Sequence, residues 1–266
     1  MGIAILGAGV MGRTLLSAFL RAGHDPAGIT VSDSDEERAR EVGAALGVDV
    51  VGPAAAARVA DVLVLAVKPQ DMDALLSEIA EQVNAGSLVI SIAAGISTDV
   101  LEDRLGCGVS VVRAMPNTPA LVDQAMSVLA PGRHCDPGHA ASAESLMGTV
   151  GAVTTLDEGH FDAVTALSGS GPAYIFYVVE AMIEAGVLLG LPRVSATELT
   201  VQTLYGAASM MRETGQHPTV LREQVSSPGG TSVAALRQLD DHKVRAAFLT
   251  AIEAAARRSR ELSAGQ

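Results

Sequence analysis

The sequence is poor in the residues on which several classes of protein depend. Its 266 residues include only two cysteines, Cys107 and Cys135, and no CxxC or histidine-rich spacing. A disulfide framework and a zinc site are therefore not expected, and we predict no metal. There is no tryptophan, there are three tyrosines and four phenylalanines, and the formal net charge is -12. Lacking a basic surface and aromatic platforms for bases, the chain is not expected to bind nucleic acid.

A targeting leader and an uninterrupted apolar span are also missing. The chain runs directly into a strand-like apolar segment at 3–6, with no basic start, apolar core and cleavage site before it. The most apolar stretch, at 174–191, contains Glu180 and Glu184, which are costly in hydrocarbon and cheap on a water-exposed helix. We therefore expect no export, no membrane contact and a cytoplasmic location.

What is present is a rhythm of short β-branched runs and helical patterns, typical of βαβ units. The expected strands are 3–6, 29–32, 62–67, 88–92, 109–113 and 126–129, and the first two helices are 11–22 and 35–46. After about Glu158 the strand signals stop and the pattern is helical. The sequence predicts an α/β fold, with a parallel-sheet domain at 1–158 followed by an all-helical domain at 159–266.

A glycine-rich loop joins the first expected strand to the first expected helix. It reads Gly7-Ala8-Gly9-Val10-Met11-Gly12, a G-x-G-x-x-G pattern. Such glycines permit a tight turn, close approach of a pyrophosphate and close helix packing, while the helix N-terminus attracts the anion. This context favours a dinucleotide-binding, Rossmann-like domain over an ordinary strand-to-helix turn.

The end of the second strand bears on the choice of cofactor. Asp33 stands where a carboxylate accepts hydrogen bonds from an adenosine ribose and repels a 2′-phosphate, which favours NADH slightly over NADPH. Against this, Ser32 and Ser34 offer hydroxyl donors to a phosphate, and Arg38 and Arg40 lie one to two turns into the next helix. A third interpretation is that Asp33 or Ser34 only caps that helix.

Three further strand ends carry candidate cofactor contacts, because ligands of such sheets bind at the carboxyl ends of strands. The candidates are Ala66, Val67, Lys68 and Pro69 at the end of the third strand, Ala93 after the fourth, and Asn117 after the fifth. Lys68 is one of only two lysines in the chain. The alternatives are a solvated lysine and structural turns.

A second loop of glycines and hydroxyls precedes a late helical run. It reads Ser226-Ser227-Pro228-Gly229-Gly230-Thr231-Ser232. Two glycines, flanking hydroxyls and a helix N-terminus make a cradle for a small carboxylate. The alternative is a helix cap formed by Thr231 or Ser232.

Taken together, these motifs resemble the pyrroline-5-carboxylate reductase family in order and spacing over nearly the whole chain. The motifs are residues 7–12, 66–69, 115–120, 167–174, 217–218 and 227–230. The resemblance implies reduction of 1-pyrroline-5-carboxylate to L-proline by NADPH or NADH, without a metal. It also implies a homo-oligomer, a dimer built by the helical domain and often assembled into a decamer.

The resemblance also assigns residue roles in the second loop. Ser227, Gly229, Gly230 and Thr231 are expected to hold the substrate carboxylate, and Ser232 to contact the imine nitrogen. The family usually has threonine where this chain has Ser232, so the hydroxyl is kept with one methyl group fewer. The family also commonly has asparagine where this chain has Pro53, on the adenosine side of the cofactor.

Two other functions remain open from the sequence. A hydroxyacid dehydrogenase of similar layout would need a catalytic lysine after the domain junction, and residues 69–242 contain none. A cofactor-binding scaffold without turnover would keep the phosphate loop but has no need of the second loop.

Overall fold

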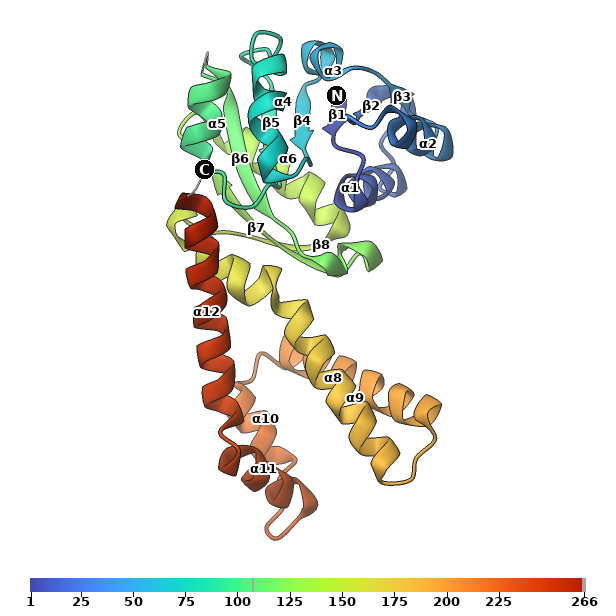
Figure 1. The fold of residues 1–266 in the computed structure, drawn as a ribbon, viewed down its shortest axis with the longest axis vertical. Helices are drawn as coiled ribbons and strands as arrows, with labels where there is room; N and C mark the ends of the chain where they lie inside the picture. Colours follow the sequence, from blue (N-terminus) through green and yellow to red (C-terminus); the bar gives the residue numbers. More distant parts are fainter. Residues whose placement is uncertain (107, 265–266) are drawn as a thin grey trace. The chain divides into compact units, whose positions relative to one another are not determined.

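The computed structural model describes residues 1–106 and 108–264. The chain divides into two compact units (Figure 1). The sheet unit comprises Met1–Ser170 together with the chain from Ala255 onward, and the helical unit is Gly171–Ala254. The sheet unit thus continues past residue 158, and Phe161 and Val164 pack against Val128 and Ala130 of the sheet.

In the sheet unit, strands alternate with helices along the chain. Its strands are β1 Ile3–Leu6, β2 Ile29–Ser32, β3 Asp49–Val50, β4 Val62–Leu65, β5 Leu88–Ser91, β6 Ser110–Met115, β7 Ala125–Pro131 and β8 Gly151–Thr155. Its helices are α1 Val10–Arg21, α2 Glu36–Leu46, α3 Pro53–Val59, α4 Met72–Ile79, α5 Thr98–Leu105, α6 Pro137–Met147 and α7 Phe161–Val164. All six expected strands are present, with ends shifted by two residues at most.

The eight strands form one sheet in the order β3-β2-β1-β4-β5-β6-β7-β8. Every neighbouring pair is parallel except β6 and β7, so the predicted parallel sheet is confirmed and contains one antiparallel pair. The connection from Met115 to Ala125 contains only a 3₁₀ helix at Thr118–Val122, too short for the crossover that a parallel pair needs. The strands β3 and β8 were not expected. The first has two residues, and the second is half exposed and begins with glycine.

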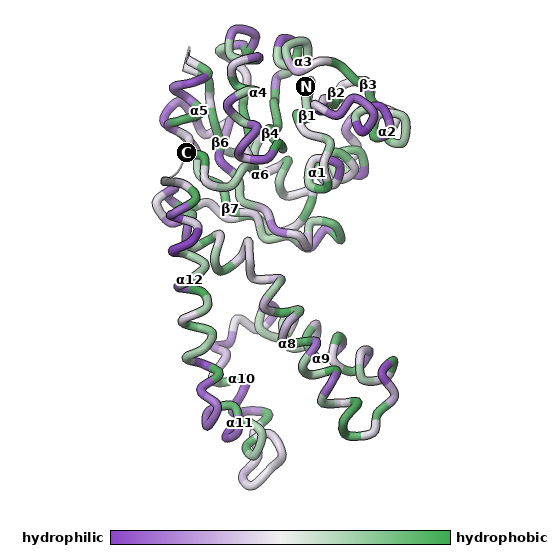
Figure 2. The backbone as a smooth tube through the Cα atoms, in the orientation of Figure 1, coloured by the Kyte–Doolittle hydropathy of each residue, from purple (hydrophilic) through white to green (hydrophobic). Residues whose placement is uncertain are grey.

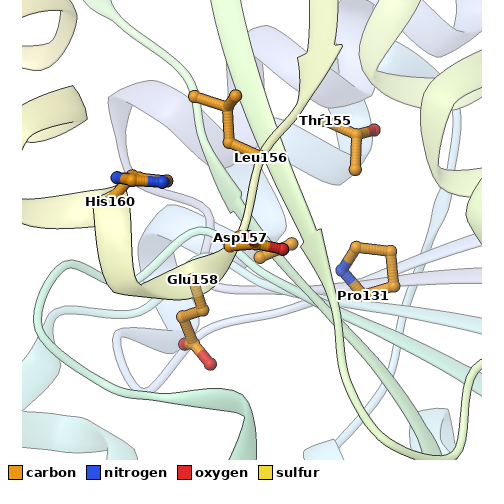
Figure 3. Close-up of a pocket in the computed structure, with 7 residues that line it drawn as sticks. Pro131, Thr155, Leu156, Asp157, Glu158 and His160 are labelled. Carbon is orange, nitrogen blue, oxygen red and sulfur yellow. The ribbon is translucent and has the colours of Figure 1, made fainter.

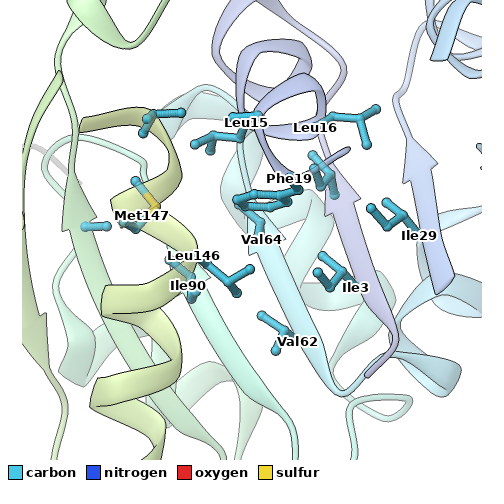
Figure 4. Packing of buried hydrophobic residues seen from close by; sticks show 14 of the residues in the cluster. Ile3, Leu15, Leu16, Phe19, Ile29, Val62, Val64, Ile90, Leu146 and Met147 are labelled. Atoms are coloured by element: carbon cyan, nitrogen blue, oxygen red, sulfur yellow. The ribbon is translucent and has the colours of Figure 1, made fainter. Parts of the chain in front are cut away.

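Helices cover both faces of this sheet, so its central strands are buried on both sides. In β1, Ile3 and Ile5 face one cluster of buried side chains, while Ala4 and Leu6 face the other. Figure 4 shows the first cluster, where Phe19 of α1 and Met147 of α6 approach the same strands. This explains the continuous apolar run at 62–65, because no residue of β4 faces water.

The helical unit buries much less of its apolar surface. Its helices are α8 Gly171–Leu188, α9 Arg193–Thr214, α10 Pro218–Gln224 and α11 Thr231–Asp241, followed by α12 Val244–Ala264, which ends in the sheet unit. Among the described residues of this unit only Ala196, Thr200 and Leu221 are buried. Figure 2 shows hydrophobic residues along α8 and α9 as well as in the sheet unit. Exposed apolar surface of this extent marks an interaction surface.

Candidate functional site

The turn between β1 and α1 is shaped by backbone rather than by side chains. Gly7 has a φ of +113°, and a Cβ atom there would lie 2.6 Å from the carbonyl oxygen of Ala66. A Cβ on Gly12 would collide with the Gly7 carbonyl oxygen, so α1 packs directly against the turn. Gly9 is the N-cap of α1, without a capping side chain, and a Cβ there would meet no atom within 4 Å. The first turn of α1 therefore borders open space, as a pyrophosphate site requires.

The turn at residues 7–12, which we call the phosphate loop, is held in position by its other residues. Ala8 is buried, Val10 is exposed at the first turn of α1, and Met11 packs against the sheet core. The backbone N–H of Gly7 donates to the Ser32 carbonyl at 2.7 Å. The loop is thus bonded to the strand next to its own.

Asp33 ties the same loop to the end of β2. Its Oδ2 accepts the Ala8 N–H at 2.7 Å, and its Oδ1 accepts the Asp35 N–H at 2.9 Å. Ser32, by contrast, has its side chain buried in the sheet. The carboxylate is therefore part of the phosphate loop's own hydrogen bonding, a role that spacing along the sequence did not indicate.

Asp35 is the residue that caps α2, not Asp33 or Ser34 as the capping interpretation held. Its Oδ1 accepts the backbone N–H of Arg38 at 3.1 Å, and its Oδ2 accepts from the Arg38 guanidinium at 2.7 Å. These bonds lower the pKa of the Asp35 carboxyl group and raise the pKa of Arg38. Arg38 also lies 3.8 Å from Oδ2 of Asp33, so two carboxylates share its charge.

The segment after β4 lies directly beside the phosphate loop. The Ala66 N–H donates to the Leu6 carbonyl at 2.8 Å, which extends the pairing of β1 and β4. Val67 packs on the second core cluster. Lys68 is exposed and precedes a 3₁₀ turn that begins at Pro69. The lysine is available to a ligand at this edge.

At the ends of β5 and β6 the candidates are bound more tightly within the protein. Ala93 is buried after β5. Asn117 donates from Nδ2 to the Ser168 carbonyl at 3.1 Å and accepts the Met126 N–H at 2.9 Å through Oδ1. Its amide therefore holds the loop after β6 in place, and one N–H of the amide is left for any ligand.

All these candidates follow parallel strands and so share one edge of the sheet. β1 lies between β2 and β4, with β5 and β6 beyond β4. The chain therefore reverses its direction of winding at β1, and this topological switch point is where such sheets bind dinucleotides. The order places Asp33 on one side of the phosphate loop and Lys68, Ala93 and Asn117 on the other.

Sequence reasoning missed a buried ion pair near this edge. Arg113 of β6 is 8% exposed, donates to Glu158 at 2.9 Å and stacks on the ring of Phe161 at 4.5 Å. Glu158 also accepts from the N–H and hydroxyl of Thr98 at the start of α5, at 2.9 and 2.6 Å. The only available signal was an arginine inside a mostly apolar strand.

Glu158 lines two hollows of the sheet unit, and Arg113 lines the larger of them. A hollow of about 370 Å³, shown in Figure 3, is lined by Glu158 together with Pro131, Thr155, Leu156, Asp157 and His160. A larger one of about 700 Å³ reaches from Glu158 to Pro69 and Gly95, next to the ends of β4 and β5. Only the larger hollow includes a predicted site residue.

The second candidate loop lies between α10 and α11 in the helical unit. The Gly230 N–H donates to the Ser227 carbonyl at 2.9 Å, and Gly229 has a φ of +70°. Proline followed by glycine in such a four-residue turn is typical of type II. A Cβ on Gly230 would lie 2.5 Å from Oγ of Ser227, so the Ser227 hydroxyl lies directly against the backbone of Gly230.

This loop also leaves a helix start without a capping side chain. Gly230 is the N-cap of α11, and neither Thr231 nor Ser232 caps it, contrary to the capping interpretation. Thr231 is exposed and Ser232 half-buried. The free N–H groups of α11 therefore suit a small anion flanked by hydroxyls.

Comparison with known proteins identifies the relatives of this chain. The family described as pyrroline-5-carboxylate reductase dimerisation matches residues 158–262. A second family, described as NADP oxidoreductase coenzyme F420-dependent, matches residues 2–95. A pyrroline-5-carboxylate reductase of Corynebacterium melassecola is 46% identical over 264 residues, 98% of each chain. The chain belongs to the pyrroline-5-carboxylate reductase family.

Solved structures of this family share the fold. A pyrroline-5-carboxylate reductase from Coxiella burnetii superimposes with a TM-score of 0.92 at 38% identity, over 98% of both chains. The Plasmodium falciparum pyrroline carboxylate reductase, solved with NADP bound, gives a TM-score of 0.89 at 26% identity, over 99% of this chain and 98% of that one. The match covers 98% or more of this chain and therefore includes residues of both units.

Proposed function

We propose that this chain reduces 1-pyrroline-5-carboxylate to L-proline with NADH or NADPH, the last step of proline biosynthesis. One observation carries the proposal: α1 and α11 each begin at a glycine N-cap with no capping side chain and no acidic residue in the first turn. A helix start of this kind binds anions. The reaction has two, a pyrophosphate on the cofactor and a carboxylate on the imine.

The proposed cofactor contacts follow the order of the strands. The phosphate loop at 7–12 holds the pyrophosphate, with Ser32 and Asp33 on the adenosine side. Ala66, Val67, Lys68 and Pro69 border the central part, and Ala93 and Asn117 the nicotinamide end. In this assignment residues 1–158 bind the dinucleotide, and residues 159–266 bind the imine and pair the chains.

The loop at residues 226–232, which we call the substrate loop, positions the imine. The imine carbon is already electrophilic when the ring nitrogen is protonated. The nicotinamide, when bound, supplies the hydride. Ser227, Thr231 and the N–H groups beside Gly229 and Gly230 hold the carboxylate. Ser232 accepts a hydrogen bond from the N–H of the protonated ring nitrogen and so orients the carbon next to it. Since a serine hydroxyl is a poor acid near neutral pH, Ser232 orients the nitrogen and is not the source of its proton.

The direct test is an assay of the purified chain with 1-pyrroline-5-carboxylate and each reduced cofactor. We expect loss of reduced-nicotinamide absorbance that depends on the imine, with L-proline formed in equal amount. Cofactor binding without oxidation would favour the alternative, a cofactor-binding scaffold.

We propose further that two copies pair through the helical unit, and that five pairs form a decamer. The stretch Glu158–Leu188 is apolar and long enough for a bilayer by length and composition alone. It nevertheless contains Glu180 and Glu184, and α8 has no buried residue within one chain. A second copy would cover this face in water, in keeping with a cytoplasmic enzyme. Light scattering should give 271 kDa (10 × 27.1). A mass of 54.2 kDa (2 × 27.1) would support the pair and contradict the decamer, and a mass of 27.1 kDa would contradict both.

A further inference from the structure

The segment after β2 carries an excess of negative charge. Residues 33–40 include four acidic and two basic side chains, a formal net charge of 2 - 4 = -2. The acidic residues are Asp33, Asp35, Glu36 and Glu37, and the basic ones are Arg38 and Arg40. A 2′-phosphate adds about two further negative charges. At the adenosine end of the site, the local field therefore opposes a phosphate.

Of the two arginines in this segment, Arg38 is already engaged by carboxylates. The Arg38 guanidinium donates to Asp35 at 2.7 Å and lies 3.8 Å from Asp33. The first turn of α2 is likewise occupied, since the Asp35 carboxylate caps it and Glu36 and Glu37 follow. To bind a phosphate here, Arg38 would have to leave two carboxylates.

The carboxylate of Asp33 cannot move aside without disturbing the phosphate loop. Its side chain is 8% exposed, and its two oxygens accept the N–H groups of Ala8 and Asp35. Each accepting oxygen keeps a free lone pair. The same group is thus able to accept from a ribose hydroxyl while it stays bonded to the loop.

We infer that the site takes NADH in preference to NADPH, with Asp33 as the specificity-determining residue that also positions the phosphate loop. The inference rests on the proposed function only in requiring that the loop binds a nicotinamide dinucleotide. A ribose with free 2′- and 3′-hydroxyls adds donors to a fixed acceptor. A 2′-phosphate meets that same fixed acceptor with like charge.

Binding of NADH and NADPH to the purified chain tests this directly. Reduced-nicotinamide fluorescence reports both, and the absence of tryptophan removes the main protein background. NADH should bind at least about tenfold more tightly than NADPH. Equal affinities, or tighter NADPH binding, would overturn the inference. Failure of both to bind would overturn the proposed function as well. An NADH preference without turnover of the imine would support the inference and contradict the function.

Three variants test which residues cause the preference for NADH over NADPH. Asp33→Asn keeps an oxygen for the Ala8 N–H and removes the charge, so the NADH to NADPH affinity ratio should fall about tenfold or more. Asp35→Asn should free Arg38 and raise NADPH affinity with little change for NADH. Asp49→Asn, an exposed aspartate at the start of β3, is the matched control and should leave the ratio unchanged.

A second probe separates affinity from loss of fold. 2′,5′-ADP carries the phosphate in question without a nicotinamide, and it should bind Asp33→Asn more tightly than the parent chain in calorimetry. Unchanged unfolding midpoints would show that the variants fold. A ratio that stays the same in a folded Asp33→Asn variant would contradict the role of Asp33.

Discussion

The helices α1 and α11 begin in the same way but are held in place differently. Both start at a glycine N-cap without a capping side chain. Around α1, the loop is bonded to β2 through Ser32 and Asp33 and packed on Ala66 beyond β4. Before α11, the loop is held by a local hydrogen bond from the Gly230 N–H to the Ser227 carbonyl. One anion site is fixed by tertiary structure, the other by a local turn.

Because of this difference, substitutions in the two loops should affect stability and function differently. A Cβ atom at Gly7 or Gly12 would collide with the backbone of Ala66 or of Gly7, so substitutions at these two positions should damage folding and cofactor binding together. A substitution in the substrate loop disturbs four residues at an exposed turn, so function should suffer with little loss of stability.

Gly7→Ala should be the most damaging change. The alanine would have to adopt a φ of +113° with its Cβ 2.6 Å from the Ala66 carbonyl oxygen. We expect a loss of about 3 kcal/mol in the free energy of unfolding and the loss of measurable NADH binding. Denaturant unfolding and nicotinamide fluorescence measure the two effects. Parent-like values for both would show that the loop is not fixed as described.

Ser232→Ala should act on catalysis alone. Removing the hydroxyl should lower kcat/KM for the imine about 10- to 100-fold, with NADH affinity and the unfolding midpoint unchanged. Ser232→Thr, which keeps the hydroxyl, is the matched control and should retain most of the activity. Equal activity of the alanine and threonine variants would remove Ser232 from the site.

Gly229→Ala tests the local turn before α11. Its φ of +70° is strained for alanine, but a Cβ would meet no atom within 4 Å. The free energy of unfolding should fall by about 1 kcal/mol, and the KM for the imine should rise several-fold. NADH affinity should not change. A loss of stability as large as that of Gly7→Ala would contradict the proposed contrast.

Asp136→Ala removes a side-chain cap, the arrangement that α1 and α11 lack. Asp136 accepts the His139 N–H at the start of α6, and this bond lowers the pKa of its carboxyl group. Because the folded pKa lies below the unfolded one of about 3.9, the carboxylate stabilises the fold above that value. The contribution is lost as pH falls through the folded pKa. The variant should therefore be less stable than the parent at pH 7, equally stable below both pKa values, and unchanged in NADH affinity.

Much of the sheet unit could be predicted because its signals are local. The run at 62–65 is buried on both faces, and the glycines at 7–12 are required by the turn itself. The two missed strands show the limit. β3 has two exposed residues, and β8 is half exposed, so neither has a hydrophobic pattern to detect.

The parts of the site that could not be predicted depend on residues far apart in the sequence. Asp33 meets Ala8 across 25 positions, and Arg113 meets Glu158 across 45. Nothing in the spacing of these residues indicates the contacts, which exist only once β2 lies beside β1 and the chain returns after β8. The capping of α2 was missed for a simpler reason: Asp33, Ser34 and Asp35 all suit an N-cap, and only the backbone decides among them.

The substitution Gly9→Asp is the sharpest test of whether the start of α1 holds the cofactor. Gly9 has ordinary backbone angles for an N-cap and open space around its Cβ position. The new carboxylate should cap α1 and leave the free energy of unfolding equal or a few tenths of a kcal/mol higher. It should also repel the pyrophosphate and weaken NADH binding at least about 100-fold, with the neutral Gly9→Asn variant affected less. A stable Gly9→Asp variant that binds NADH as the parent does would contradict the claim that this helix start holds the cofactor.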